Sequence, residues 1–237
     1  MISVLMPVYN LFSYPEGWFE RAVESVNGCE LCIVDDCSTD KTFDYLSSLK
    51  DVKVGRTKAN SGGAEACNVA AGMATGDYFI LLSCRSWYEP GSLKSMSEFL
   101  DKHPDVGFVY GQTHFYNDHR FGDWVKVPDP FNPDDFLRRF ASSFGYLYRR
   151  EAWDAGCKYD CTVWIEEAKR FMTIADYDMA MQLIFKMNWR GFALRDVLAL
   201  NYEFGGKQMN DLLEQYHGRI KQEFRKRWGF PKKLETA

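Results

Sequence analysis

Short apolar runs alternate with amphipathic segments through the first half of the chain, and only short connections separate them. We expect strands at residues 2–7, 29–34, 52–56, 78–82 and 106–110, and helices at residues 15–26, 41–49, 64–74 and 90–102. Alternating strands and helices with short loops build a mostly parallel sheet that helices cover on both faces. The sequence therefore predicts an α/β fold.

Polar residues follow three of the expected strands at the point where each strand ends. They are Tyr9–Asn10, Asp35–Asp36 and residues 83–86. Ligands of open α/β sheets bind beyond the carboxyl ends of the strands. We therefore expect these residues to converge on one crevice.

The second half of the chain has a less regular pattern. Residues 114–133 are aromatic and polar with three prolines, which predicts a loop or hairpin beside the crevice. Further elements are expected as a helix at 136–140, a strand at 145–148, a helix at 176–187, a strand at 192–200 and an amphipathic helix at 210–228. With no internal repeat and no linker, we predict one domain at residues 1–205 that a basic C-terminal helix within 206–237 continues.

Charge is unevenly distributed along the chain, which has 237 residues and a net charge of −4. Residues 217–233 carry seven basic side chains against Glu223 alone, a net charge of +6 that leaves −10 for the rest. An acidic body argues against a general nucleic-acid-binding protein. The basic segment fits either a solvated helix face or a peripheral contact with an anionic membrane surface, polyanionic acceptor or partner.

The seven cysteines are an odd number in largely apolar surroundings, which favours reduced thiols over a secreted disulfide framework. Cys29 and Cys32 have metal or redox spacing, but an apolar run continues after them and no second Cys or His pair follows at zinc-site spacing. We find no signal peptide and no apolar stretch of about 18 residues, the length of a membrane span. These observations predict a soluble, cytoplasmic protein.

Several motifs, in order along the chain, resemble those of the family 2 glycosyltransferases. The matching segments are residues 4–10 (VLMPVYN), 33–42 (IVDDCSTDKT), 60–63 (NSGG), 76–78 (GDY), 147–150 (LYRR) and 175–178 (ADYD). The resemblance covers roughly residues 1–205 and implies a GT-A fold and an inverting transferase with a nucleotide-sugar donor, expected to be a UDP-sugar. It leaves the acceptor open among a glycan, a lipid-linked glycan, a protein and a nucleobase.

The resemblance implies roles for the residues at the strand ends. Tyr9 would stack on the nucleobase through its ring face, and Asp36 would accept a hydrogen bond from the imide N–H of uracil. Asp35 would support the turn or contact the ribose. Further donor contacts are implied for Pro7, Asn60, Asn68 and Ser83. Without the family, an Asp-Asp-x-Ser turn is also ordinary helix-capping chemistry.

Asp176 resembles the catalytic base of the family. An inverting transfer needs one carboxylate to take the proton of the acceptor hydroxyl as that hydroxyl attacks the anomeric carbon. The family usually has Glu before this Asp, whereas this chain has Ala175, and Asp178 is a neighbouring carboxylate that competes for the role. The alternative is that Asp176 caps a helix that begins at Tyr177.

The chain departs from the metal-binding pattern of the family. Where the family has Asp-x-Asp for Mg²⁺ or Mn²⁺, this chain has Ser83-Cys84-Arg85-Ser86, and the expected histidine is absent from residues 201–206. Hard divalent cations prefer anionic oxygen ligands, so we expect Arg85 to bind the diphosphate in place of a metal. Two alternatives stay open: a divalent ion held by Glu203 or Asp178, and a catalytically silent nucleotide-sugar-binding or scaffold protein.

Overall fold

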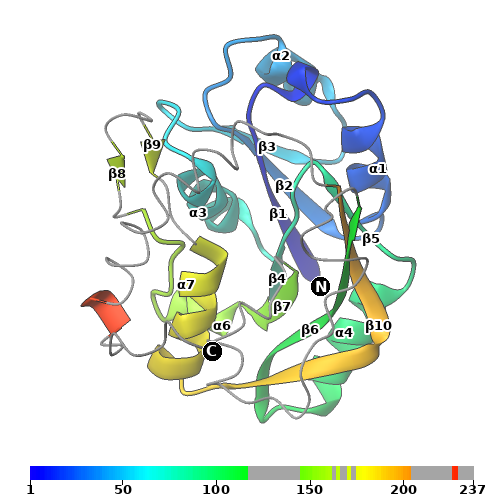
Figure 1. Ribbon diagram of the computed structural model, residues 1–237, viewed down its shortest axis with the longest axis vertical. Coiled ribbons are helices and arrows are strands. Elements are labelled where there is room, and N and C mark those ends of the chain that lie inside the picture. Colours follow the sequence, from blue (N-terminus) through cyan, green and yellow to red (C-terminus); the bar gives the residue numbers. More distant parts are fainter. Residues whose placement is uncertain (117–144, 162–163, 166–169, 172–174, 204–225, 229–237) are drawn as a thin grey trace.

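The computed structural model describes residues 1–116, 145–161, 164–165, 170–171, 175–203 and 226–228. In these ranges an eight-stranded sheet has the order β3-β2-β1-β4-β7-β6-β10-β5 (Figure 1). Its strands are β1 (Ile2–Val8), β2 (Glu30–Asp35), β3 (Lys53–Arg56), β4 (Tyr78–Leu81), β5 (Ser86–Tyr88), β6 (Val106–Tyr116), β7 (Tyr146–Arg149) and β10 (Arg190–Glu203). A second sheet pairs β8 (Trp164–Ile165) with β9 (Arg170–Phe171).

Six strands of the large sheet run in one direction, because only β7 and β5 are antiparallel to their neighbours. The carboxyl ends of β1, β2, β3, β4, β6 and β10 therefore share one edge, which we call the carboxyl edge. The register places Val8 beside Asp35, and Asp35 beside Arg56. The mostly parallel α/β sheet that the sequence predicts is confirmed.

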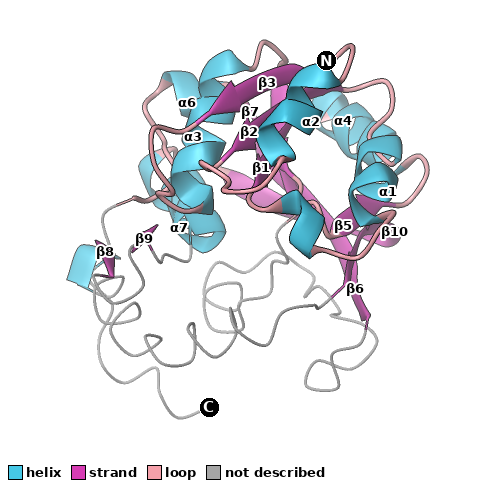
Figure 2. Ribbon diagram, turned by 90° about the horizontal axis from the view of Figure 1, so that it is seen from above, coloured by secondary structure: helices cyan, strands magenta, loops and turns pink. Residues whose placement is uncertain are grey.

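Helices cover both faces of the sheet, as predicted (Figures 1 and 2). One face carries α1 (Trp18–Glu24), α2 (Thr42–Ser48) and α4 (Ser92–Lys102), and the other carries α3 (Gly63–Met73), α6 (Glu151–Asp154) and α7 (Ala175–Met181). The π-helical turn η2 (Gln182–Lys186) continues α7, and the 3-10 turn η1 (Leu11–Ser13) follows β1. Side chains of β1 alternate between two cores: Leu5 packs under α3, whereas Val4 and Met6 pack under the helices of the opposite face.

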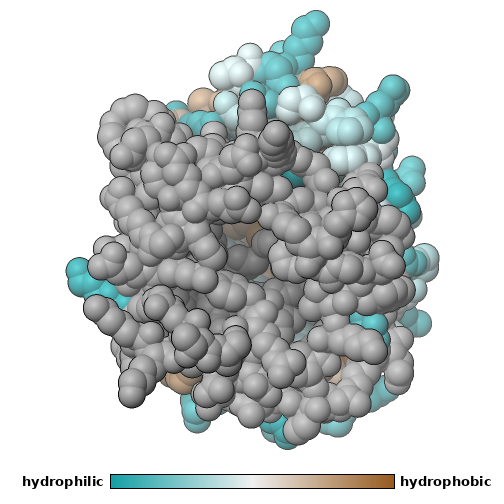
Figure 3. Space-filling model, viewed as in Figure 1, coloured by the Kyte–Doolittle hydropathy of each residue, from teal (hydrophilic) through white to brown (hydrophobic). Residues whose placement is uncertain are grey.

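The surface of the described residues that is visible in Figure 3 is mostly hydrophilic, with small separate hydrophobic spots. Within the described ranges, no helix combines the length and the apolar character that a membrane crossing requires.

Strands β6 and β10 are longer than the sequence predicts. In β10, the polar pair Arg195–Asp196 interrupts the apolar pattern. The register with β6 shifts between Leu194 and Leu198, so the strand continues past an irregularity that breaks its alternation. Apolar alternation alone therefore ends the predicted strand too early.

Strand β5 was missed, because three residues after a polar turn carry too little pattern to identify a strand. The short helix α6 was missed for the same reason. The loop or hairpin expected at 114–133 begins within β6, which continues to Tyr116, and the rest of it lies outside the described residues. The expected helix at 136–140 and most of the expected helix at 210–228 and of the segment 206–237 also lie outside them. The domain boundary at residue 205 stays a prediction.

Glu30 joins the amino ends of three strands. Its carboxylate accepts hydrogen bonds from the Ser3 hydroxyl of β1 and from the Thr75 N–H (2.7 Å) and hydroxyl (2.6 Å), and it pairs with Lys53 Nζ of β3 at 2.6 Å. Burial raises the pKa of this carboxyl, but the hydrogen bonds from Lys53, Ser3 and Thr75 outweigh burial and lower the pKa from 4.5 to about 2. The ionised form is therefore the one that the fold stabilises.

We expect Glu30→Gln to lower the free energy of unfolding at pH 7 by about 2–3 kcal/mol. The contribution of a carboxyl with a lowered pKa is complete above the unfolded-state pKa near 4.5 and is lost as the pH falls toward 2. Urea denaturation at several pH values measures this loss, which is expected in the unmodified chain and absent in the variant. Glu24→Gln is the matched control, because Glu24 is exposed. Equal effects of the two substitutions at pH 7 would contradict the assignment.

Candidate active site

Asp35, the last residue of β2, is fully buried and organises the turn that follows it. It accepts hydrogen bonds from the Ser38 N–H (3.1 and 3.2 Å) and the Ser38 hydroxyl, and pairs with Arg56 Nε at 3.0 Å. Arg56 also donates to the Ser38 carbonyl at 3.0 Å and lies 4.7 Å from the centroid of the Phe43 ring. Of the two roles predicted for Asp35, the structure shows support of the turn. Arg56 is a site residue that was not predicted from the sequence, although the parallel pairing of β2 and β3 places it beside Asp35.

Asp36 fixes the loop between β3 and α3. Its Oδ1 accepts hydrogen bonds from the Thr57 hydroxyl (2.9 Å) and the Ser61 N–H (3.0 Å), and its Oδ2 accepts one from the Gly62 N–H (2.7 Å). Gly62 has a φ of +96°, a conformation that favours glycine. Because a carboxylate has about four acceptor positions, Asp36 Oδ2 retains one for a further donor. The half-buried Asn60 lies in the loop that Asp36 holds.

Asn10 connects the end of β1 to the turn after β2. It adopts a left-handed backbone with a φ of +48°. Its N–H donates to Ser38 Oγ at 2.8 Å, and its Oδ1 accepts from the Thr39 N–H at 2.9 Å. The half-buried Tyr9 stands directly before it, so the ends of β1 and β2 form one hydrogen-bonded unit. Pro7 lies in β1, paired with Val34 of β2.

The segment Ser83–Ser86 follows β4 at the same edge. Ser83 Oγ accepts a hydrogen bond from the Arg85 N–H at 3.3 Å, and the Arg85 guanidinium lies 5.7 Å from the centroid of the Tyr14 ring. Cys84 is buried, and burial, opposed by the charge of Arg85, raises its pKa to about 11. This thiol is therefore neutral at physiological pH.

These four residues do not fit a Mg²⁺ or Mn²⁺ site. They offer a cation at Arg85, a neutral thiol at Cys84 and two neutral hydroxyls, and the hydroxyl of Ser86 is buried with no hydrogen-bond partner in the described part of the chain. Hard divalent cations bind anionic oxygens, which are absent from this set. In the same described ranges no three His, Cys, Asp or Glu side chains gather as a metal site.

Asn68 in α3 holds a distant segment of backbone. Its Nδ2 donates to the Tyr159 carbonyl at 2.9 Å and to Cys161 Sγ at 3.4 Å, and its Oδ1 accepts from the Tyr159 N–H at 2.9 Å. The side-chain amide of Asn68 is therefore hydrogen-bonded to the segment that follows α6. The donor contact predicted for Asn68 stays a prediction.

Asp176 is the second residue of α7, which begins at Ala175. The helix expected at residues 176–187 is thus present, beginning one residue earlier and continued by η2. The alternative start at Tyr177, with Asp176 as the cap, is wrong, because the helix already includes Asp176. Asp178, its competitor, is 2% exposed, and three side-chain donors occupy its carboxylate. The observed contacts of Asp178 are those of a buried structural acid.

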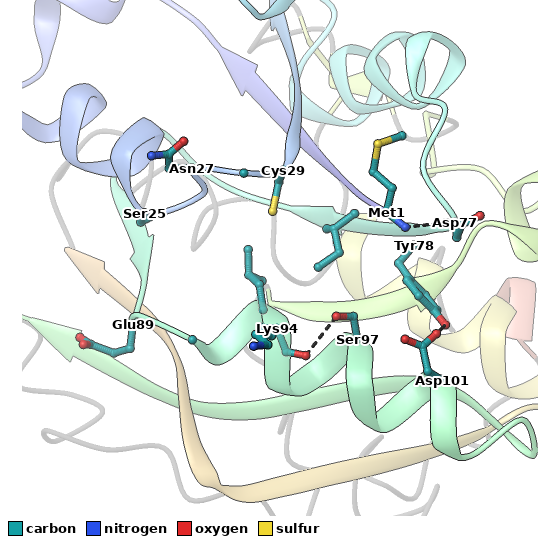
Figure 4. Close-up of a pocket in the computed structure, with 14 residues that line it drawn as sticks. Met1, Ser25, Asn27, Cys29, Asp77, Tyr78, Glu89, Lys94, Ser97 and Asp101 are labelled. Atoms are coloured by element: carbon teal, nitrogen blue, oxygen red, sulfur yellow. Dashed lines mark hydrogen bonds and ion pairs between the residues drawn. The ribbon is translucent and has the colours of Figure 1, made fainter.

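A pocket of about 620 Å³ lies at the opposite edge of the sheet, at the amino ends of β1 and β4 (Figure 4). Asp77, Tyr78, Lys94 and Asp101 are among its lining residues, and the Tyr78 hydroxyl donates to Asp101 at 2.6 Å. None of the predicted site residues lines this pocket. The candidate site is therefore defined by the side chains at the carboxyl edge.

The sequence model of glycosyl transferase family 2 matches residues 3–190 and includes every predicted site residue. The chain belongs to this family. TuaG of Bacillus subtilis (strain 168), a putative teichuronic acid biosynthesis glycosyltransferase, is 24% identical over 227 residues, which cover 85% of this chain and 90% of TuaG. TarS of Staphylococcus aureus (strain Mu50), a poly(ribitol-phosphate) β-N-acetylglucosaminyltransferase, is 29% identical over 108 residues, 43% of this chain and 19% of TarS.

Solved structures of other glycosyltransferases share the fold of this family 2 member. Residues 1–349 of S. aureus TarS in complex with UDP-GlcNAc align with a TM-score of 0.67 and 20% identity, over 88% of this chain and 60% of that one. The mannosyltransferase PcManGT of Pyrobaculum calidifontis, in complex with GDP-Man and Mn²⁺, aligns with a TM-score of 0.64 and 16% identity, over 98% of this chain and 65% of that one. The expected GT-A fold is confirmed. Several curated relatives are longer proteins, of which this chain spans 21% to 42%.

Proposed function

We propose that this chain transfers a sugar from a UDP-sugar donor to a hydroxyl of a glycan acceptor, with inversion at the anomeric carbon and without a divalent cation at the Ser83–Ser86 segment. The observation that carries the proposal is the arrangement at the carboxyl edge, where Asp36 retains an acceptor position beside the end of β1. Family membership and the UDP-GlcNAc bound to TarS support a nucleotide-sugar donor. The names of TuaG and TarS support a glycan or related polymer as acceptor.

In the proposed complex, uracil stacks on Tyr9 and donates its imide N–H to Asp36 Oδ2. A stacked aromatic ring supplies contact area but little discrimination between bases. Discrimination comes from Asp36, because a buried carboxylate accepts a hydrogen bond from a donor and repels a lone pair. Asp35 does not contact the base in this proposal. Its bonds to Ser38 and Arg56 hold the turn that positions Asp36.

Arg85 binds the diphosphate in this proposal. Its guanidinium offers paired N–H donors that match two phosphate oxygens, and its charge offsets the negative charge that develops on the leaving UDP. Mg²⁺ or Mn²⁺ would supply the same charge compensation, but the side chains of the Ser83–Ser86 segment lack the anionic oxygens to hold either ion.

Asp176 is the proposed general base. The acceptor oxygen attacks the anomeric carbon from the face opposite the diphosphate, and its proton passes to the Asp176 carboxylate. The new bond joins the acceptor oxygen to the anomeric carbon as the bond from that carbon to the diphosphate oxygen breaks. Because the attacking and leaving oxygens occupy opposite faces, the configuration at the anomeric carbon inverts.

Isothermal titration calorimetry with UDP and CDP tests the base-recognition part of the proposal. The two nucleotides differ at ring position 3, where uracil has an N–H donor and cytosine a lone pair. We expect UDP to bind at least about tenfold more tightly than CDP, which corresponds to one hydrogen bond to a charged acceptor. Equal affinities, or no binding of either nucleotide, would overturn the role of Asp36.

A catalytically silent nucleotide-sugar-binding protein is the second candidate, and the missing anionic metal ligands favour it. Release of UDP from UDP-GlcNAc, first with water and then with glycan acceptors, separates the two candidates. Turnover identifies the transferase, whereas tight UDP binding without turnover across the acceptors supports the binding protein.

A further inference from the structure

We propose that Arg227 and Trp228 are positioning residues that hold α7, and with it Asp176, through the buried carboxylate of Asp178. This inference rests on the proposed function, in which Asp176 is the general base. Arg227 belongs to the basic segment 217–233, and the residues Lys226–Trp228 form the short red helix in Figure 1.

Asp178 is a buried carboxylate that three side-chain donors hold, two of them from the C-terminal segment. Its Oδ1 accepts from Arg227 Nη1 at 3.1 Å and from Trp228 Nε1 at 2.8 Å, and its Oδ2 accepts from Gln182 Nε2 at 2.8 Å. A buried carboxylate needs such partners, because desolvation without compensation disfavours its charged form. Two of the three donors come from residues about fifty positions further along the chain.

Arg227 connects α7 to a second element. Its Nη2 donates to Asp160 Oδ1 at 2.8 Å, while its Nη1 holds Asp178. Asp160 follows Tyr159, whose backbone N–H and carbonyl are held by Asn68 of α3. The guanidinium thus bridges α7 to a segment that is itself fixed on the central fold. A residue with one donor could not make both contacts.

Apolar packing of Trp228 also holds the C-terminal segment against α7 and η2. The indole of Trp228 is partly buried against the core cluster that includes Met179, Met181 and Leu183. Its ring centroid lies 6.3 Å from that of Phe185 in η2. The C-terminal segment is therefore anchored on α7 and its π-helical extension by a charge pair, an indole hydrogen bond and apolar contact.

The anchor lies two residues after Asp176 in the same helix. The first four N–H groups of a helix lack intrahelical partners, so the start of a short helix depends on outside contacts for its position. Asp178, in the first turn of α7, receives such contacts from Arg227 and Trp228. They fix the part of the helix that carries the proposed base, whereas the proposed donor contacts come from other elements, at the ends of β1 and β2 and in the segment after β4.

Arg227→Ala tests the inference against Lys226→Ala, a matched loss of one charge at an exposed neighbour. We expect Arg227→Ala to lower kcat for UDP release from UDP-GlcNAc about ten- to a hundredfold, the scale of a slightly misplaced catalytic group. The Kd of UDP should change less than twofold. Amide hydrogen exchange should rise in α7 and stay unchanged in α1 and α2. Lys226→Ala should leave all three measurements within twofold of the unmodified chain.

Two further variants separate positioning from a general structural effect. Arg227→Lys should recover part of kcat, because an ammonium group can pair with one carboxylate but cannot bridge two in the same way. Trp228→Phe removes the indole N–H but keeps an aromatic ring. We expect it to lower kcat less than Arg227→Ala does, again with little change in the Kd of UDP and with increased hydrogen exchange in α7. It also serves as the test if Arg227→Ala does not fold.

The inference is overturned if Arg227→Ala matches Lys226→Ala in kcat and α7 exchange, or if exchange rises throughout the molecule with an equal loss of UDP affinity. Asp176→Asn in parallel distinguishes failure of the proposed function. If that variant retains full activity, the base assignment is wrong. If it is inactive while Arg227→Ala is not, only the positioning role is wrong.

Discussion

Asp176→Asn is expected to lower kcat about a hundredfold to ten-thousandfold, the range that positioned proton transfer contributes. The amide has nearly the shape of the carboxylate but cannot take the proton of the acceptor hydroxyl. The Kd of UDP should stay within twofold, because the proposed nucleotide contacts come from the ends of β1 and β2 and the segment after β4, and not from α7. Initial rates of UDP release at saturating UDP-GlcNAc measure the effect on kcat.

The matched control is Asp154→Asn in α6, the same chemical change at an exposed helical carboxylate. We expect this control to retain the rate of the unmodified chain. A rate for Asp176→Asn within threefold of the control would remove Asp176 from the mechanism. The base would then have to be sought among other residues, and Asp178 is a poor candidate because its buried carboxylate holds the side chains of Arg227, Trp228 and Gln182.

Arg85→Ala should lower kcat about a hundredfold to a thousandfold, comparable to the loss of one preorganised group that stabilises transition-state charge. The activity of the unmodified chain should survive EDTA, because the proposed stabilising charge belongs to the protein. The kcat of Arg85→Lys should lie between those of Arg85→Ala and the unmodified chain, since lysine keeps the charge but loses the bidentate geometry. UDP release with and without EDTA tests both statements.

Lys94→Ala is the control for Arg85, because Lys94 is a cation that lines the pocket at the opposite edge of the sheet. Full activity of Arg85→Ala would reject the role of Arg85. Activity that EDTA abolishes and Mn²⁺ restores would contradict the metal-independent reaction and point to ligands outside the Ser83–Ser86 segment.

Much of the fold followed from local pattern. Buried strands that alternate with amphipathic helices define a mostly parallel sheet, and the rule that ligands bind at carboxyl ends selected Tyr9, Asp35 and Asp36 before any side-chain position was known. The structure brings the ends of β1 and β2 together through Asn10 and Ser38, as that rule requires. The sheet and the adjoining ends of β1 and β2 could be predicted because they depend on residues that are neighbours in sequence or in adjacent parallel strands, whereas ligand binding by Tyr9, Asp35 and Asp36 stays a prediction.

What the pattern did not predict depends on pairings between distant segments. Arg56 became visible only with the register of β2 and β3, and the contact of Asn68 with Tyr159 joins residues 91 positions apart. Asp178 looked like a rival base because its partners, Arg227 and Trp228, are about fifty residues away. The spacing of residues in the sequence does not predict such contacts, since they arise from the packing of α3, α7 and the C-terminal segment.

Asp35 and Asp36 hold their loops in place in the absence of a bound nucleotide. The Ser38 hydroxyl donates a hydrogen bond to Asp35, and the Gly62 N–H donates one to Asp36. A nucleotide would therefore meet a preorganised surface and would not have to order a flexible loop, a process that subtracts from binding free energy. In the proposed complex, the geometry that selects the base is therefore set during folding and not by the arrival of the nucleotide.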